Sequence, residues 1–372
     1  MATPSIQTPL PDPAASGATP GQLEFTPKQI LANDPHDEPL IAGGVLCHGG
    51  FVDGDYVSPR CLFRTPAIEN WQRRLLDEGH ALISLPTRYV PPHYPNYQQA
   101  KLLLQQGVVD PITRSLTIIS IVEGFGARIR DVPLPDLRGE VVENIDGTAL
   151  AHLDQGLLEA HARDEAGHRS EGGHKQMWEA ARDLGLDKPE VPEDVLLRMM
   201  SGQRRSRPER SFPQLSERME GLITVLSNVM VIEIFAEDVF EWAKRLLGDP
   251  EVSADAAAAA AMVAHIQSDE KPHVQYLRTA LSELRARTLR SDDGKREIPG
   301  QQVIDEIFKR QLRGMATQRP QEQREQLRKE VHESFDDKAR ASELARRFDS
   351  LDSGWVFPHR DDEPVEILLE TA

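Results

Sequence analysis

Two short segments of this chain repeat one pattern of acidic residues and histidine. DEAGH at 164–168 and DEKPH at 269–273 both place a histidine three residues after a glutamate. On a helix, residues three apart project from one face, so each pair directs its side chains toward one place. The same acid-to-histidine spacing occurs at Asp77/His80 and Glu171/His174. The pattern therefore constrains the fold only together with the helices around it.

Two further glutamates lie on apolar helical faces, Glu123 within LTIISIVEGFGARI and Glu233 within VLSNVMVIEIFAEDVF. An ionised carboxylate on such a face is costly unless it is paired or binds a metal. One glutamate from each of two helices and a Glu-x-x-His from each of two others is the ligand set of dinuclear carboxylate bundles. Four carboxylates balance two divalent ions. The predicted metal ligands are Glu123, Glu165, His168, Glu233, Glu270 and His273.

Apolar periodicity predicts four helices, over 112–130, 148–184, 215–247 and 253–288. A Pro- and Arg-bearing connection at 186–213 separates the two pairs, which is the connectivity of a ferritin-like four-helix bundle. We expect an all-α fold with this bundle at 106–290. We expect a disordered leader at 1–22, an irregular N-terminal extension at 23–105, and charged C-terminal helices and a tail at 291–372.

Three of these segments resemble the ferritin-like di-iron carboxylate superfamily. DEKPH at 269–273 resembles the second iron motif of acyl-carrier-protein desaturases. IVEG at 121–124 and IEIFA at 232–236 resemble the first- and third-helix segments of aldehyde-deformylating oxygenases. The resemblance covers about residues 112–285. It implies a four-helix fold and two iron ions, with a manganese–iron pair as a variant, and O2 as co-substrate. It implies no substrate and no catalytic residue beyond the metal ligands.

Alternatives exist for three of the ligands, Glu165, His168 and Glu233. Glu171/His174 competes with Glu165/His168, which is favoured by its preceding aspartate and its place before the Gly-Gly at 172–173. Glu237 lies one turn after Glu233 and competes with it for the same place; Glu233 is favoured, with Glu237 as a candidate additional ligand.

His161, four residues before Glu165, is another candidate ligand, with a buried core histidine as the competing interpretation. Asp164 and Asp269 precede the two Glu-x-x-His pairs. We expect them to accept hydrogen bonds from metal-bound histidines across the site. The competing interpretation is a solvated helix charge.

The charge balance limits the class of partner. Among 372 residues, 43 are basic and 60 acidic, a formal charge of −17, which argues against nucleic acid. We see neither an apolar run of about 20 residues for a membrane span nor a secretory signal. Cys47 and Cys61 fit a reducing compartment and give no metal spacing. We therefore expect a cytoplasmic protein.

The expected function is that of a non-heme di-iron oxidoreductase that uses O2 to oxidise a small, partly apolar metabolite. The outcome would be hydroxylation, N-oxygenation, desaturation or C–C cleavage, with an external electron donor and a homodimeric assembly. One alternative is a ferritin-like iron-storage protein without an organic substrate. Another is a heme-oxygenase-like di-iron oxidase, which would leave Glu123 and Glu233 unexplained.

Overall fold

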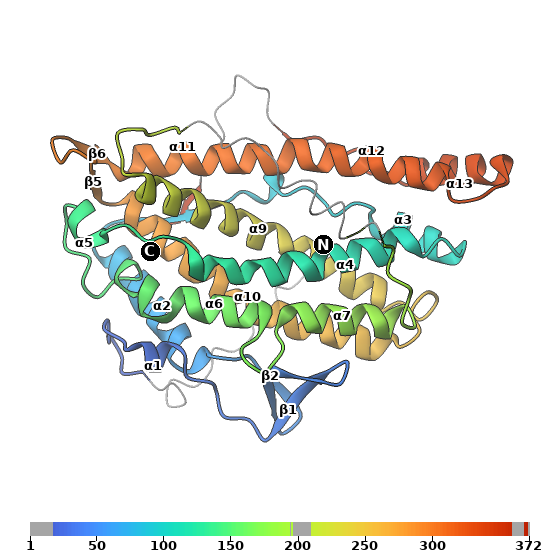
Figure 1. Ribbon diagram of the computed structural model, residues 1–372, viewed down its shortest axis with the longest axis horizontal. Helices are drawn as coiled ribbons and strands as arrows, with labels where there is room; N and C mark the ends of the chain where they lie inside the picture. The colour runs from blue at the N-terminus through green and yellow to red at the C-terminus, as the bar shows by residue number, and fades with distance from the viewer. Residues whose placement is uncertain (1–17, 194, 196–209, 359–367, 371–372) are drawn as a thin grey trace, which may run out of the picture.

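The chain is predominantly helical, which confirms the expected all-α class. The computed structural model describes residues 18–193, 195, 210–358 and 368–370. Most of the expected leader and most of the connection at 186–213 therefore lie outside the described residues. Long helices run along the longest axis of the molecule, and a small sheet lies at one side (Figure 1).

The helices of the described chain vary from one turn to about eight turns. Their bounds are α1 Pro27–Ile30, α2 Cys61–Asp77, α3 Tyr97–Gln105, α4 Asp110–Gly126, α5 Leu137–Glu140, α6 Leu158–Ala166, α7 His174–Gly185, α9 Glu217–Leu247, α10 Ala256–Arg285, α11 Gly300–Arg313, α12 Arg319–His332 and α13 Lys338–Ser350. α4 packs against α6 and α7, α7 packs against α10, and α10 packs against α9. α11 covers α9 and α10.

The two longest helices begin and end at local signals in the sequence. The Ser216 side chain accepts a hydrogen bond from the backbone N–H of Met219 at the start of α9, and Gly248 follows its end. Asp255 caps α10 by accepting from the N–H of Ala258. α10 continues through Pro272. The predicted bounds of both helices are therefore correct to within a few residues.

The prediction of a single helix at 148–184 was wrong. Short 3₁₀ and π turns occupy Leu150–His152 and Leu153–Leu157, and then α6 ends at Ala166. Gly167 has φ of 81°, which a residue with a side chain rarely adopts. A hairpin follows, closed by two backbone hydrogen bonds between His168 and Glu171 of 3.0 and 3.1 Å. α7 then starts afresh at His174.

The N-terminal extension contains regular structure. β1 Glu38–Ala42, β2 Val45–Val52 and β3 Asp55–Val57 form an antiparallel sheet. The hairpin between α6 and α7 is attached to β2, because Gly172 N–H donates to Leu46 O at 2.7 Å. β4 Leu82–Ser84 pairs with β7 Leu368–Glu370 from the C-terminal tail, and β5 Thr288–Arg290 pairs with β6 Glu297–Pro299.

The hydrophobic core is divided into two clusters along the long helices. One contains Met219 to Val231 of α9 and Tyr276 to Leu284 of α10. The other contains Phe240 to Leu247 of α9 and Ala259 to Ile266 of α10. Glu233 and Glu270 fall in the interval between the clusters. A buried polar layer therefore separates two apolar halves.

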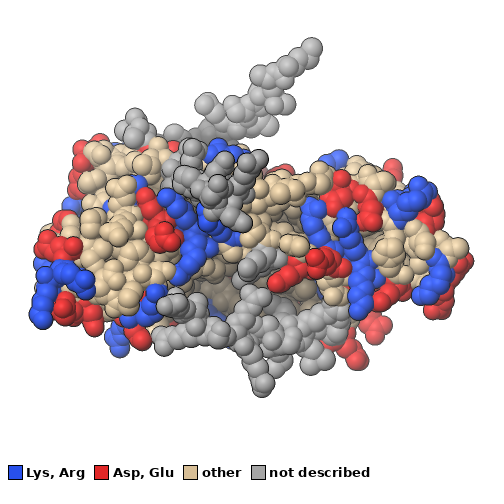
Figure 2. Space-filling view, turned by 90° about the horizontal axis from the view of Figure 1, so that it is seen from above, with Lys and Arg blue, Asp and Glu red and all other residues tan. Residues whose placement is uncertain are grey.

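The outer face carries charges of both signs. On the side of α11 to α13, basic and acidic side chains intermingle (Figure 2). Within the described residues, one helix, α9, has the length and hydropathy of a membrane span, with half of its apolar window buried. A helix in a protein core has the same composition.

Candidate metal centre

Five of the six predicted ligands meet in the polar layer. Glu123 comes from α4, Glu165 from α6, Glu233 from α9, and Glu270 and His273 from α10. They fall in two of the three groups of potential metal donors among the described residues, in each of which the ligand atoms lie within 4.8 Å of one another; the third group contains His48, His174 and Asp269. The two groups share Glu165.

The first group contains Glu123, Glu165, His174 and Glu270. His174 Nδ1 lies 2.8 Å from Glu270 Oε1 and 3.6 Å from Glu165 Oε1. Trp178, one turn further along α7, donates a hydrogen bond from Nε1 to Glu123 Oε1 at 3.1 Å. Carboxylates from three helices thus surround one imidazole nitrogen.

The second group contains His161, Glu165, Glu233 and His273. His161 Nε2 lies 3.7 Å from both Glu165 Oε1 and Glu233 Oε1. Its ring stacks on that of His273 with centroids 4.0 Å apart. His273 Nδ1 lies 2.7 Å from Glu270 Oε2 and 3.2 Å from Glu165 Oε1. His161, an optional ligand by sequence, therefore stands among the donors.

The sixth predicted ligand, His168, is not among these donors. Because α6 ends at Ala166, His168 no longer follows Glu165 by one helical turn and lies in the hairpin, lining a separate surface pocket. His174, from the competing Glu171/His174 pair, takes the expected place beside Glu165, whereas Glu171 lies in the hairpin. The site combines one member of each pair, an arrangement that helical spacing does not predict.

Glu237, the competitor of Glu233, also lies outside both groups. Its side chain is exposed and accepts a hydrogen bond from Gln267 Nε2 at 2.8 Å. Glu233 is 8% exposed and faces His161.

Asp164 is a fully buried acceptor behind His273. His273 Nε2 donates to Asp164 Oδ2 at 2.9 Å, which leaves Nδ1 facing the carboxylates. Arg60 Nε donates to Asp164 Oδ1 at 2.7 Å, and Arg64 Nη1 donates to Oδ2 at 2.6 Å. Burial alone would raise the pKa of Asp164, but the two arginines hold it well below its usual range. Neither arginine carries a signal in the sequence, because only the tertiary fold brings α2 to α6.

Asp269 has the corresponding place behind His174. His174 Nε2 and His48 Nε2 each lie 3.5 Å from Asp269 Oδ2, and Tyr56 donates its hydroxyl hydrogen to that oxygen at 2.8 Å. His48 and Tyr56 come from the sheet of β1 to β3. Each of them precedes Asp269 by more than 200 residues in the sequence. Sequence spacing could not indicate either of them.

The carboxylates of the centre divide into two electrostatic classes. Burial raises the pKa of Glu123 and Glu233 well above the usual range, and neighbouring carboxylates raise it further. Burial acts the same way on Glu165 and Glu270, but contacts with the histidines outweigh it and lower their pKa. Binding of a cation would favour the ionised form of all four.

Buried negative charge exceeds buried positive charge around the site. With all six carboxylates ionised and the histidines neutral, as metal binding requires, the four glutamates and two aspartates exceed the two buried arginines by four charges, as many as two divalent cations neutralise. Within the described chain, His161 Nε2 and both carboxylate oxygens of Glu165 have no hydrogen-bond partner. Buried polar atoms rarely stay unpaired. The donor set therefore fits a pair of metal ions.

A cavity of about 1190 Å³ reaches the centre from the side of α9 and α10. Glu233 and Glu270 contribute to its lining, together with apolar side chains such as Phe240, Val274 and Trp355. Acidic groups and one lysine also line it, namely Glu237, Asp238, Glu241 and Lys271.

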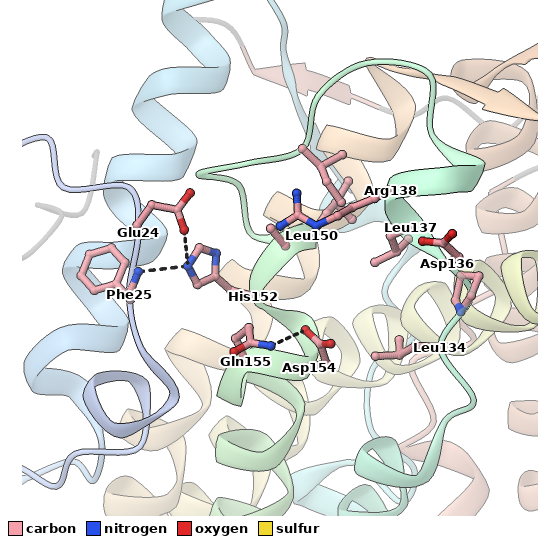
Figure 3. A pocket seen from close by; sticks show the side chains of 13 residues that line it. Glu24, Phe25, Leu134, Asp136, Leu137, Arg138, Leu150, His152, Asp154 and Gln155 are labelled. Atoms are coloured by element: carbon pink, nitrogen blue, oxygen red, sulfur yellow. Dashed lines mark hydrogen bonds and ion pairs between the residues drawn. The ribbon is translucent and has the colours of Figure 1, made fainter.

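A second cavity, of about 420 Å³, surrounds His152 (Figure 3). His152 Nε2 accepts a hydrogen bond from the backbone N–H of Phe25 at 3.0 Å, and Nδ1 lies 2.7 Å from Thr148 O. Both ring nitrogens are therefore engaged by backbone groups. This histidine anchors the N-terminal segment, and the cavity has none of the grouped metal donors.

The comparisons with known proteins return nothing similar: no family model, curated protein or solved structure matches the chain.

Proposed function

We propose that the chain is a non-heme di-iron oxidoreductase of the ferritin-like kind, which uses O2 to oxidise a small organic molecule. The observation that carries the proposal is the pair of donor groups joined by Glu165. In this proposal α4, α6 with α7, α9 and α10 are the four helices of the bundle. Glu123, His174 and Glu270 would hold one ion, His161, Glu233 and His273 would hold the other, and Glu165 belongs to both groups.

The chemistry of the donors supports iron. Carboxylate and imidazole groups suit iron and manganese, whereas structural zinc sites favour cysteine. When bound, redox-active ions supply the electrons that reduce dioxygen. A manganese–iron pair fits the same donors.

The surrounding residues hold the ligands in place. Asp164 fixes His273 by accepting from Nε2, and Asp269 lies behind His174 in the same way. Such partners set the orientation and tautomer of metal-bound histidines. Glu123 and Glu233, whose pKa values are raised, would release their protons when metal binds, so metal affinity should rise with pH.

The large cavity supports an organic substrate over iron storage alone. It leads to Glu233 and Glu270 between apolar walls, where a molecule would lie against the ions. Apolar walls exclude water from the reacting centre. A partly apolar metabolite fits this lining.

Oxygen consumption tests the proposal. Protein loaded anaerobically with Fe(II) and then exposed to air should consume O2 and develop a transient visible absorbance. Glu233→Ala should lose iron and oxygen consumption, whereas Glu237→Ala, one turn away and outside the donor groups, should retain both. Two bound iron ions without any oxygen consumption would refute the oxidase function.

A further inference from the structure

A small basic pocket lies beside the metal centre, at the hairpin between α6 and α7. Its volume is about 330 Å³. Arg60, Arg163 and Arg169 line it together with His168 and Ser170. It contains the histidine that sequence spacing assigned to the metal and that the centre does not use.

Positive charge in and behind this pocket is not fully neutralised. Arg60 and Arg64 share one carboxylate, Asp164. Arg163 and Arg130 likewise share Glu159, with contacts of 2.7 and 3.3 Å.

Arg169 is exposed at the tip of the hairpin and has no ion pair with any described residue. Glu171 is the one acidic residue in the lining. Of the three arginines in the lining, Arg60 is paired with Asp164 and Arg163 with Glu159, so Arg169 is the one that has its charge free for a ligand.

Two of the arginines have an uncommon backbone conformation. Arg60 has φ of 56° and Arg169 has φ of 57°, in the left-handed region that residues other than glycine seldom adopt. The backbone bonds of His168 with Glu171 fix the turn that holds Arg169. Asp34 Oδ2 accepts from the N–H groups of Cys61 and Leu62 and fixes the turn that holds Arg60. Such conformations concentrate where side chains clamp a ligand.

We propose that this pocket binds a phosphate group, either as free phosphate or as the phosphate of a small metabolite. Planar guanidinium groups form paired, charge-assisted hydrogen bonds with phosphate oxygens. Three arginines reach the pocket, Arg169 has no ion pair with any described residue, and Ser170 offers a hydroxyl donor. The site does not depend on the proposed oxidase activity.

The pocket is also connected to the metal centre. Arg60 lines the pocket and donates to Asp164, which in turn accepts from His273. A phosphate drawing on Arg60 would therefore act on the support of one proposed metal ligand.

Calorimetric titration with inorganic phosphate, and separately with glycerol phosphate, tests the proposal on the full-length protein as purified, at constant ionic strength. We expect saturable binding of one phosphate group per chain. Tighter binding of the ester would assign the site to a phosphorylated metabolite, and tighter or equal binding of phosphate would assign it to the free ion. Absence of saturable binding for both would overturn the proposal.

Variants of the pocket arginines distinguish phosphate bound in this pocket from phosphate bound at the proposed metal ions. Arg169→Asn removes the charge while asparagine tolerates the left-handed backbone, and it should weaken binding about tenfold or more. Arg163→Gln should weaken binding in the same direction. Arg347→Ala removes an equal charge from the exposed face of α13 and should leave the affinity unchanged. Equal affinity in wild type and Arg169→Asn, or equal weakening by Arg347→Ala, would place the phosphate elsewhere.

Discussion

Asp164 joins three positively charged or protonated groups at the centre of the molecule. It accepts from Arg60, Arg64 and His273, and none of the four side chains is more than 3% exposed. Burial of charge is tolerated only where each ion has partners. The orientation of the His273 ring is therefore set by Asp164 at Nε2 and by Glu270 and Glu165 at Nδ1.

Asp164→Asn should destabilise the fold strongly. It leaves two buried guanidinium groups without a counter-ion, which costs about 3 kcal/mol or more. Urea denaturation should show this loss, and Glu237→Gln, at an exposed glutamate, should leave the unfolding midpoint unchanged. Equal midpoints for wild type and Asp164→Asn would contradict the assigned role.

The two competing histidines should differ in their effect on metal content. His174→Ala should reduce bound iron from two ions per chain to one or none, because His174 stands within the first donor group. His168→Ala should keep both ions, since that side chain lies in the basic pocket. Metal analysis of the two purified variants measures the iron bound per chain. Loss of iron in His168→Ala and not in His174→Ala would support His168 as the ligand, as the helical spacing predicted.

The sequence predicted most of the metal-ligand candidates, but only some of the residues that hydrogen-bond to them. Glu123 and Glu233 attract attention because a carboxylate interrupts an apolar helical face. The prediction of His168 assumed that a continuous helix joins it to Glu165, because a spacing of three residues places two side chains on one face only within a helix. Gly167 and the Gly-Gly at 172–173 already signalled a break there. The sequence did not indicate Arg60, Arg64 and His48 as partners of the site, because only the folded chain brings them to Asp164 and Asp269.

At the scale of elements, the break between α6 and α7 shapes both sites. Ending α6 at Ala166 allows α7 to bring His174 beside Glu165, and the intervening hairpin forms the basic pocket. The bounds of α9 and α10 followed from apolar periodicity to within a few residues. The turns at 150–157 and the hairpin did not, because their glycines permit several conformations and tertiary contacts decide among them.

Gly167→Ala should disrupt this break. At φ of 81° a Cβ would be strained and would overlap the backbone oxygen of Glu171. The loss of unfolding free energy should be about 2 kcal/mol or more, and iron content should fall with it.

Gly221→Ala is the matched control, since Gly221 lies within α9 with open space around it. It should be neutral or stabilising by up to about 1 kcal/mol. Thermal unfolding of both variants measures the difference. A neutral Gly167→Ala would show that the hairpin conformation is not required.

At the scale of the whole molecule, a charged layer lies between two apolar clusters. The clusters stabilise the fold, whereas the crowded carboxylates oppose it unless cations bind, as we propose. Removing metal with a chelator should therefore lower the melting temperature, as expected for any ligand that binds only the folded state.

Stability should also fall as pH rises through the range set by Glu283. This buried side chain accepts from the N–H groups of Ala149 and Leu150, and burial raises its pKa to about 7. The folded state then binds a proton at Glu283 more tightly than the unfolded state does. The contribution of Glu283 to the free energy of unfolding is therefore fully present below about pH 4.5 and lost by about pH 7. The loss amounts to about 3 kcal/mol.

Urea denaturation of wild type and Glu283→Gln at several pH values isolates this effect. The variant should show a flatter dependence on pH between 4.5 and 7, because glutamine does not ionise. Parallel curves for the two proteins would show that Glu283 titrates normally.

The number of iron ions bound per chain tests the central claim most directly. Protein loaded anaerobically with Fe(II) and freed of excess metal should retain two ions per chain, with a Mössbauer signal of carboxylate- and histidine-bound iron. Retention of no iron, or of a single ion, would contradict the dinuclear centre that we propose, whose ligands are Glu123, Glu165, His174, Glu270, His161, Glu233 and His273.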